Sequence, residues 1–201
     1  MINNINLKNP KISKTQLKNV KIYSDREEFA NSLNSQLCIL EIGTLAGDYA
    51  DLLLTRNPKT LDLLDSYNSS DIHGLERFEE SNHYEYVQNK YKNNVNVNII
   101  KGLSDFTLPS LNKKYYDYIY IDADHSYESI SNDLNNSIRL LKDDGIIGLN
   151  DYLIADINNN KYDTVFAVNK FLHDNHNWEV IGIALHPFMF CDIYIKKMDS
   201  F

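Results

Sequence analysis

The densest group of chemically active side chains lies in the segment IYIDADHSYESI, which places Asp122, Asp124 and His125 within four positions. The segment GLNDY adds Asp151. Both segments complete strand-like runs, and neighbouring parallel strands end about 5 Å apart. Asp122 and Asp151 are therefore expected to converge, where they could ligate one hard cation. His125 could be a third ligand or a general base.

A simpler role is open for part of this group. Asp124 and Ser126 are of the types that cap the N-terminus of a helix, and the pattern predicts a helix from about residue 126. His125 would then be an ordinary loop residue. Capping accounts for one carboxylate rather than three, so the remaining acids favour a functional site.

A second group of residues surrounds the turn in LEIGTLAGDYADLL. Gly43 would let the chain turn sharply and approach a ligand closely, and the helix that follows would present free N–H groups. A Walker phosphate loop is excluded because no Gly-Lys-Ser/Thr follows, and the dinucleotide fingerprint G-x-G-x-x-G is replaced by G-x-x-x-G. The alternative is that Gly43 and Gly47 serve only the strand-to-helix turn.

Two further strand ends carry polar residues. Asp65 ends the run TLDLLD, where one carboxylate could accept hydrogen bonds from both hydroxyls of a ribose, or could simply open a loop. Asp62, inside the same run, is the weaker candidate. After the next strand, Gly102 allows a close backbone approach, and Ser104 or Asp105 could cap a turn or contact a base.

Strand-like and helical patterns alternate along the chain, which predicts an α/β fold with a mostly parallel sheet and helices on both faces. The last two strands are joined by a connection too short for a parallel crossover, so they are expected to form an antiparallel hairpin. The expected strands are 37–42, 60–65, 95–100, 116–122, 146–150, 178–184 and 188–196, and the expected helices are 47–56, 71–92, 126–141 and 164–174, with a short helical turn near 104–112.

Composition limits the kinds of function. The 201 residues fit one domain, and 24% charged with 43% hydrophobic residues is globular usage. A net charge of −8 argues against duplex nucleic acid as the partner, because binding phosphates needs a basic surface. Cys38 and Cys191 lie in apolar runs, which indicates free thiols in a reducing compartment. With no signal peptide or membrane span in the sequence, we expect a cytoplasmic protein that does not bind membranes.

Together these motifs resemble those of class I S-adenosylmethionine-dependent methyltransferases, in particular a small family with a D-x-D-H-x-Y segment after strand four. The resemblance covers about residues 37–197 and rests on E-x-G-x-x-x-G, YDYIYIDADHSYESISNDL and KDDGIIGLNDY. It implies a Rossmann-like seven-stranded sheet, a catalytic domain over 37–201 and a helical N-terminal extension over 1–36. The residues that it implies for binding S-adenosylmethionine are Glu41, Gly43, Thr44, Gly47, Asp65, Ser104 and Asp122.

The resemblance also implies a reaction. Related O-methyltransferases activate an acceptor hydroxyl with Mg²⁺ held by carboxylates at the ends of strands four and five. Carried over, this would make metal ligands of Asp122, Asp124, His125 and Asp151. The chain departs from the catechol-type pattern, which has Lys in place of His125 and Asn in place of Tyr152. Without a metal, His125 would be the general base of a catalytic pair with Asp122.

The acceptor is expected to be a small polar molecule or a saccharide, since the segments beside the strand ends are polar and the N-terminal extension is short. Residues there that could bind it are Tyr67, His73, His83, Tyr152 and Asp156. Two other functions stay open: a catalytically inactive module that binds S-adenosylmethionine or a nucleoside, and a metal-assisted enzyme of different chemistry. The oligomeric state is also open, with a homodimer among the alternatives.

Overall fold

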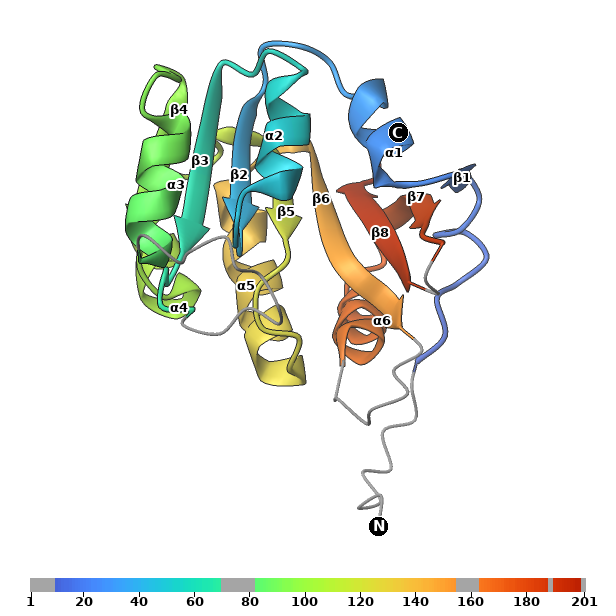
Figure 1. The fold of residues 1–201 in the computed structure, drawn as a ribbon. Coiled ribbons are helices and arrows are strands. Elements are labelled where there is room, and N and C mark those ends of the chain that lie inside the picture. Colours follow the sequence, from blue (N-terminus) through green and yellow to red (C-terminus); the bar gives the residue numbers. More distant parts are fainter. Residues whose placement is uncertain (1–9, 70–81, 155–162, 188–189, 200–201) are drawn as a thin grey trace.

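The computed structural model describes residues 10–69, 82–154, 163–187 and 190–199. These residues form one eight-stranded sheet in the order β1-β7-β8-β6-β5-β2-β3-β4, with helices on both faces (Figure 1). β8 runs antiparallel to β6 and β7, and all other neighbouring strands are parallel. The predicted α/β fold, with a mostly parallel sheet and a C-terminal antiparallel hairpin, is confirmed.

The elements follow the predicted order along the chain. The main difference in length is in β6, which extends the expected strand 146–150 at both ends. The expected helix 71–92 is described only from residue 82 onward, where it forms α3. The strands are β1 (Lys21–Tyr23), β2 (Cys38–Ile42), β3 (Thr60–Asp65), β4 (Val97–Lys101), β5 (Tyr116–Ile121), β6 (Leu141–Ile154), β7 (Trp178–Leu185) and β8 (Phe190–Lys197). The helices are α1 (Arg26–Ser32), α2 (Asp48–Leu54), α3 (His83–Tyr91), α4 (Ser104–Thr107), α5 (Tyr127–Leu140) and α6 (Thr164–Asp174), and the 3-10 turn η2 (Leu108–Ser110) follows α4.

The sheet has one strand more than the seven that were predicted. β1 pairs in parallel with β7 at one edge, with Lys21 opposite Gly182. The segment before residue 37 was expected to be helical, and among its described residues only α1 is an α-helix. β1 spans three residues, and its central Ile22 is exposed, so no alternation of apolar and polar residues marks it in the sequence. Pairing with β7, rather than local propensity, makes this segment a strand.

The central strands are buried on both faces. Along β5, Tyr118 and Tyr120 point to one face while Ile119 and Ile121 point to the other, because successive side chains of a strand alternate. All four are at most 3% exposed. The tyrosine face packs against α1, α2 and α3, and the isoleucine face packs against α5 and α6. The faces of the sheet are therefore covered, which leaves the strand ends as the place for a ligand.

The N-terminal segment belongs to the core. Phe29 of α1 is 2% exposed, and its ring stacks on Tyr194 of β8 with the centroids 3.3 Å apart. Tyr23 of β1 meets both rings edge-on. Asp25 caps α1 by accepting a hydrogen bond from the Glu28 N–H at 2.7 Å. These contacts fix α1, and with it the position of its first residue, Arg26.

Replacing Phe29 by alanine should therefore destabilise the whole domain. We expect Phe29→Ala to lower the free energy of unfolding by about 3–5 kcal/mol, because it leaves a cavity against Tyr194. Urea denaturation measures this change. Val95→Ala is the control, since Val95 is fully exposed and its truncation should change stability by less than about 0.5 kcal/mol. Equal effects of the two substitutions would contradict the packing of α1.

Candidate functional site

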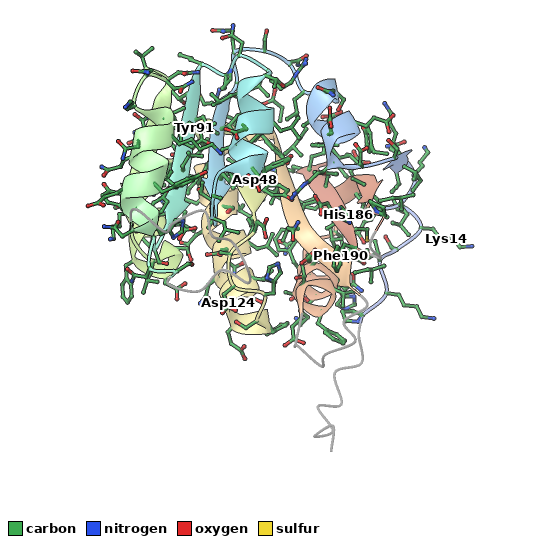
Figure 2. The ribbon with its side chains drawn as sticks, viewed as in Figure 1. Lys14, Asp48, Tyr91, Asp124, His186 and Phe190 are labelled. Atoms are coloured by element: carbon green, nitrogen blue, oxygen red, sulfur yellow. The ribbon has the colours of Figure 1, made fainter. Side chains whose placement is uncertain are left out.

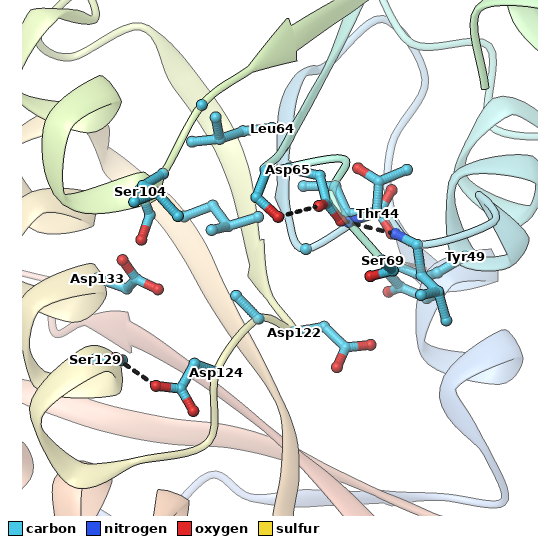
Figure 3. Close-up of a pocket in the computed structure, with 18 of the residues that line it drawn as sticks. Thr44, Tyr49, Leu64, Asp65, Ser69, Ser104, Asp122, Asp124, Ser129 and Asp133 are labelled. Atoms are coloured by element: carbon cyan, nitrogen blue, oxygen red, sulfur yellow. Dashed lines mark hydrogen bonds between the residues drawn. The ribbon is translucent and has the colours of Figure 1, made fainter. Parts of the chain in front are cut away.

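A cavity of about 600 Å³ opens at the carboxyl ends of β2, β3, β4 and β5 (Figure 3). The order of the sheet reverses here, since β3 and β4 extend from one side of β2 while β5 lies on the other. Open parallel sheets bind ligands at such a point. Of the residues predicted to contact a cofactor, those that line the cavity are Glu41, Gly43, Thr44, Asp65, Ser104 and Asp122; Gly47 is not among them.

The turn between β2 and α2 depends on glycine at two positions for two different reasons. Gly43 has φ of +87°, and a Cβ there would lie 2.0 Å from the carbonyl oxygen of Asp122. Gly47 has φ of +80°, and a Cβ there would lie 2.2 Å from the hydroxyl of Tyr91. Gly43 thus allows the turn to lie directly against the end of β5. Gly47 instead allows α2 to begin close to α3, which matches the purely structural role considered for it.

Side chains of α3 hold the carbonyl groups of this turn, residues 45–47. His83 Nε2 lies 2.7 Å from the Leu45 carbonyl oxygen, and Lys90 Nζ donates to the carbonyl of Ala46 at 2.8 Å. The Tyr91 hydroxyl donates to the carbonyl of Gly47, also at 2.8 Å. Since the carbonyl groups face α3, the turn is braced from behind and its shape does not depend on a ligand.

Asp65 holds the other side of the same turn. Its Oδ2 accepts hydrogen bonds from the backbone N–H groups of Thr44 and Leu45 at 2.9 and 3.0 Å, and its Oδ1 accepts from the N–H of Tyr67 at 2.8 Å. Asp65 therefore joins the end of β3 to the glycine turn. The prediction that Asp65 lies at the ligand cavity agrees with this position, and its backbone hydrogen bonds are an additional role that the sequence did not reveal.

Glu41 is a buried acid on the cavity wall. Its side chain is 1% exposed, and its Oε2 has no hydrogen-bond partner. Burial raises the pKa of Glu41 well above its ordinary value, and the nearby Asp122 raises it further while Arg26 lowers it. An unpartnered buried carboxyl oxygen is costly, so it marks a position where a ligand donor would be bound favourably.

Three of the four predicted metal ligands do come together. His125 Nε2 lies 3.7 Å from Asp122 Oδ1 and 3.7 Å from Asp151 Oδ2. Asp151 has φ of +50° at a break in the pairing of β6 with β8, and bulges of this kind redirect side chains near functional sites. Burial raises the pKa of Asp122 and of Asp151, and it lowers the pKa of His125. At neutral pH His125 is therefore uncharged and able to accept a proton.

Asp124, the fourth predicted ligand, faces another way. Its carboxylate accepts hydrogen bonds from the Ser126 and Ser129 hydroxyls at 2.8 and 2.7 Å, and these bonds lower its pKa. It thus supports the N-terminus of α5, as the capping alternative proposed. Among the described residues, no three histidine, cysteine, aspartate or glutamate side chains are grouped so as to hold a metal ion. The side chains present do not fit the predicted Mg²⁺ site, which is left without support.

The residues predicted to bind an acceptor have structural roles where the structure describes them. The Tyr67 hydroxyl donates to the Leu63 carbonyl, Tyr152 donates to Asn169, and His83 contacts the glycine turn. Each is an amphipathic side chain that is buried with its polar atom bonded inside the protein, a distinction that composition does not make. His73 and Asp156 lie outside the described residues.

A smaller cavity of about 240 Å³ adjoins the first and contains two residues that sequence reasoning missed. Arg26 and Asp122 line both cavities. Asp192 of β8 is 6% exposed and accepts a hydrogen bond from the Tyr120 hydroxyl at 2.8 Å. Burial raises the pKa of Asp192 to about 6, although Tyr120 and Arg26 lower it. The other lining residues are Asn150, Asp151, Leu185, His186 and Phe190; Figure 2 marks His186 and Phe190 beside each other.

One of these two residues left a signal in the sequence. Asp192 is an acid inside the apolar strand FMFCDIYIK, and a charged residue in a buried strand usually has a function or a specific partner. Arg26 lies in the ordinary polar stretch DREEF and left none. Its guanidinium lies 5.4 Å from the ring centroid of Tyr49. It is also the one lysine or arginine among the described residues that line either cavity.

Comparison with known proteins places this arrangement in a family. The profile of the family described as "Methyltransferase domain" matches residues 40–152, more than half of the chain. This chain belongs to that methyltransferase family. The matched part of the methyltransferase domain contains the glycine turn, Asp65 and the group of Asp122, His125 and Asp151. A search of curated protein sequences found no match.

Solved structures agree with the methyltransferase fold. Cofactor-bound Rv0187 from MTB is 18% identical with a TM-score of 0.63, over 86% of this chain and 77% of that one. Phosphoethanolamine N-methyltransferase 1 of Haemonchus contortus, in complex with phosphoethanolamine and S-adenosylhomocysteine, is 16% identical with a TM-score of 0.62, over 88% of this chain and 42% of that one. Aeropyrum pernix fibrillarin with natively bound S-adenosyl-L-methionine is 15% identical with a TM-score of 0.56, over 81% and 67%.

Two other expectations can be compared with the methyltransferase domain. Cys38 and Cys191 are buried free thiols, as predicted. In the described parts of the chain, every helix is too short or too polar to cross a membrane.

A methyl group added at Gly43 should be much more harmful than one added at Gly102. Gly43→Ala forces a side chain into a left-handed backbone and against the backbone of Asp122, so we expect a loss of about 2 kcal/mol or more in unfolding free energy. At Gly102 the nearest atom is the rotatable Thr107 hydroxyl and φ is not positive, so the cost should be smaller. Thermal unfolding compares the two variants, and equal losses would refute the close approach at Gly43.

Removing the Asp124 carboxylate tests its capping role. We expect Asp124→Ala to lower the unfolding free energy by about 1 kcal/mol at pH 7, as loss of a helix cap does. Because the pKa is lowered in the folded state, this stabilisation is complete above the unfolded pKa of about 3.9 and is lost as the pH falls through the folded pKa. Urea titrations at several pH values measure the difference. A difference that does not depend on pH would argue against the charged cap.

Proposed function

We propose that this methyltransferase transfers a methyl group from S-adenosylmethionine to a hydroxyl group of a small polar molecule, a saccharide among the candidates. The observation that carries the proposal is the pair of adjoining cavities, which share Arg26 and Asp122. A donor in the larger cavity and an acceptor in the smaller one would meet at Asp122. Solved structures of the same fold hold S-adenosylmethionine or S-adenosylhomocysteine, which supports this choice of donor.

The lining of the larger cavity suits S-adenosylmethionine. The unpartnered Oε2 of Glu41 would accept a hydrogen bond from the ammonium group of the methionine part. Gly43 leaves room for the ligand to approach the backbone of the turn. Asp65 already accepts three backbone hydrogen bonds, but two carboxylate oxygens offer about four acceptor positions, so it can still bind a ribose hydroxyl. The bound cofactor would supply an electrophilic methyl group on a positively charged sulfur.

The residues between the cavities would position the acceptor and take its proton. The acceptor oxygen attacks the methyl carbon in line, the carbon–sulfur bond breaks with its electron pair going to sulfur, and the hydroxyl proton passes to Nε2 of His125. His125 suits this role because burial lowers its pKa and keeps it neutral at pH 7. Asp122 lies 3.7 Å from the same nitrogen and would orient the acceptor. No step in this mechanism passes through a metal ion.

Calorimetric titration with S-adenosylmethionine tests the cofactor. We expect binding with Kd in roughly the micromolar range, weakened at least tenfold in Asp65→Ala and unchanged in Asp143→Ala, a control in which the carboxylate is exposed. The affinity should be the same with Mg²⁺ and with a chelator. A wild-type protein that binds no S-adenosylmethionine would refute the proposal, and binding that requires Mg²⁺ would restore the metal site.

Turnover tests the chemistry. With a panel of small hydroxyl compounds, formation of S-adenosylhomocysteine is followed by mass spectrometry. We expect His125→Gln to lower kcat by about 10²–10⁴-fold, the usual contribution of a general base, while cofactor affinity stays within about twofold. Equal turnover in wild type and variant would remove His125 from the mechanism. Cofactor binding without turnover on any acceptor would instead favour an inactive binding module.

A further inference from the structure

Asp133, in the middle of α5, is a buried acid that the proposed mechanism does not use. Its side chain is 0% exposed, and neither carboxylate oxygen has a hydrogen-bond partner of ordinary geometry. It lines the larger cavity together with Ser104 and Ser129. Figure 3 shows Asp133 between these two serines, on the side of the cavity opposite Thr44 and Tyr49.

The surroundings of Asp133 do not compensate its charge. Burial raises its pKa to about 6, the Ser104 hydroxyl offsets part of this rise, and Asp105 and Asp124 add to it. The group is therefore mostly ionised at pH 7, in a place where its charged neighbours are acids. A buried carboxylate in this condition is unfavourable until a hydrogen-bond donor reaches it.

A second buried acid on the same sheet shows what a structural carboxylate looks like here. Asp62 of β3 is 8% exposed, and its two oxygens accept hydrogen bonds from the Tyr116 hydroxyl at 2.6 Å and from the Asn98 amide at 2.7 Å. Asp62 does not line the cavity. Asp133 has the same burial without such partners, so its donor must come from the cavity and not from the protein.

The order of groups along the cavity identifies that donor. If Glu41 and the glycine turn hold the amino-acid part and Asp65 holds the ribose, the base lies beyond Asp65, at the end formed by Ser104 and Asp133. Adenine presents an exocyclic amine with two N–H donors. We propose that Asp133 accepts a hydrogen bond from this amine and thereby selects adenine over a base with an oxygen at that position. The inference rests on the proposed binding of S-adenosylmethionine.

Two ligands that differ at this one position test the proposal. S-adenosylhomocysteine carries the amine, and S-inosylhomocysteine carries an oxygen in its place. By calorimetry, the wild-type protein should bind the adenosyl compound about 10–100 times more tightly, since the oxygen would face a carboxylate. In Asp133→Asn the side-chain amide can donate to that oxygen, so the preference should fall below about threefold or reverse.

Stability separates this role from a structural one. Asp133→Asn should leave the melting temperature of the ligand-free protein unchanged or raise it, because it removes an unpartnered buried charge. Asp62→Asn is the matched control and should lower the melting temperature, because it disturbs two hydrogen bonds. Failure of Asp133→Asn to fold, or a loss as large as that of Asp62→Asn, would overturn the proposal.

The binding data distinguish the two levels of the argument. If the wild-type protein binds neither compound, the proposed cofactor is wrong and the role of Asp133 falls with it. If the wild-type protein binds S-adenosylhomocysteine but shows less than a twofold preference, or if Asp133→Asn keeps the full preference, then only the role of Asp133 is overturned. The wild-type ratio alone can refute the proposal, without any variant.

Discussion

The turn between β2 and α2 lies directly on the backbone at the end of β5, and the rest of the site depends on this contact. Only a residue without Cβ fits between the two segments, because a Cβ on Gly43 would lie 2.0 Å from a carbonyl oxygen. The contact brings Asp65, which binds the N–H groups of the turn, close to Asp122. With its carbonyls bonded to α3, the turn has both kinds of backbone group satisfied before any ligand arrives. Such preorganisation reduces the ordering that binding would otherwise require.

The site also collects negative charge in a way that a purely structural core would avoid. Glu41, Asp122, Asp151 and Asp192 all have raised pKa values, and Arg26 is the cation that lowers each of them. Acids packed this closely weaken the folded state, and proteins keep such arrangements mainly at functional sites. A cofactor with a positive sulfur would face these acids favourably. The same charges disfavour an anionic acceptor, which agrees with a neutral hydroxyl compound.

Sequence reasoning predicted the positions set by the strands better than those set by packing. Asp122 and Asp151 follow adjacent parallel strands, so their convergence followed from topology alone. The roles of Tyr67 and Tyr152 could not be predicted in the same way, because a tyrosine ring suits a core and a surface equally and only the fold decides which. The seven-stranded prediction missed β1 because an edge strand of three residues carries no periodic pattern. Arg26 reaches the site through the stacking of its helix on β8, a long-range contact that leaves no local trace.

The pairing of β1 with β7 and the stacking of α1 on β8 join the two ends of the described chain. During synthesis, the strands that form the cofactor cavity leave the ribosome well before β7 and β8 do. Contacts between residues so distant in sequence form late, because loop closure must precede them. Arg26 is made early but can take its place only when the final hairpin is available. A partly synthesised chain would therefore carry an acidic, unneutralised cavity, and the electrostatic completion of the site coincides with completion of the sheet.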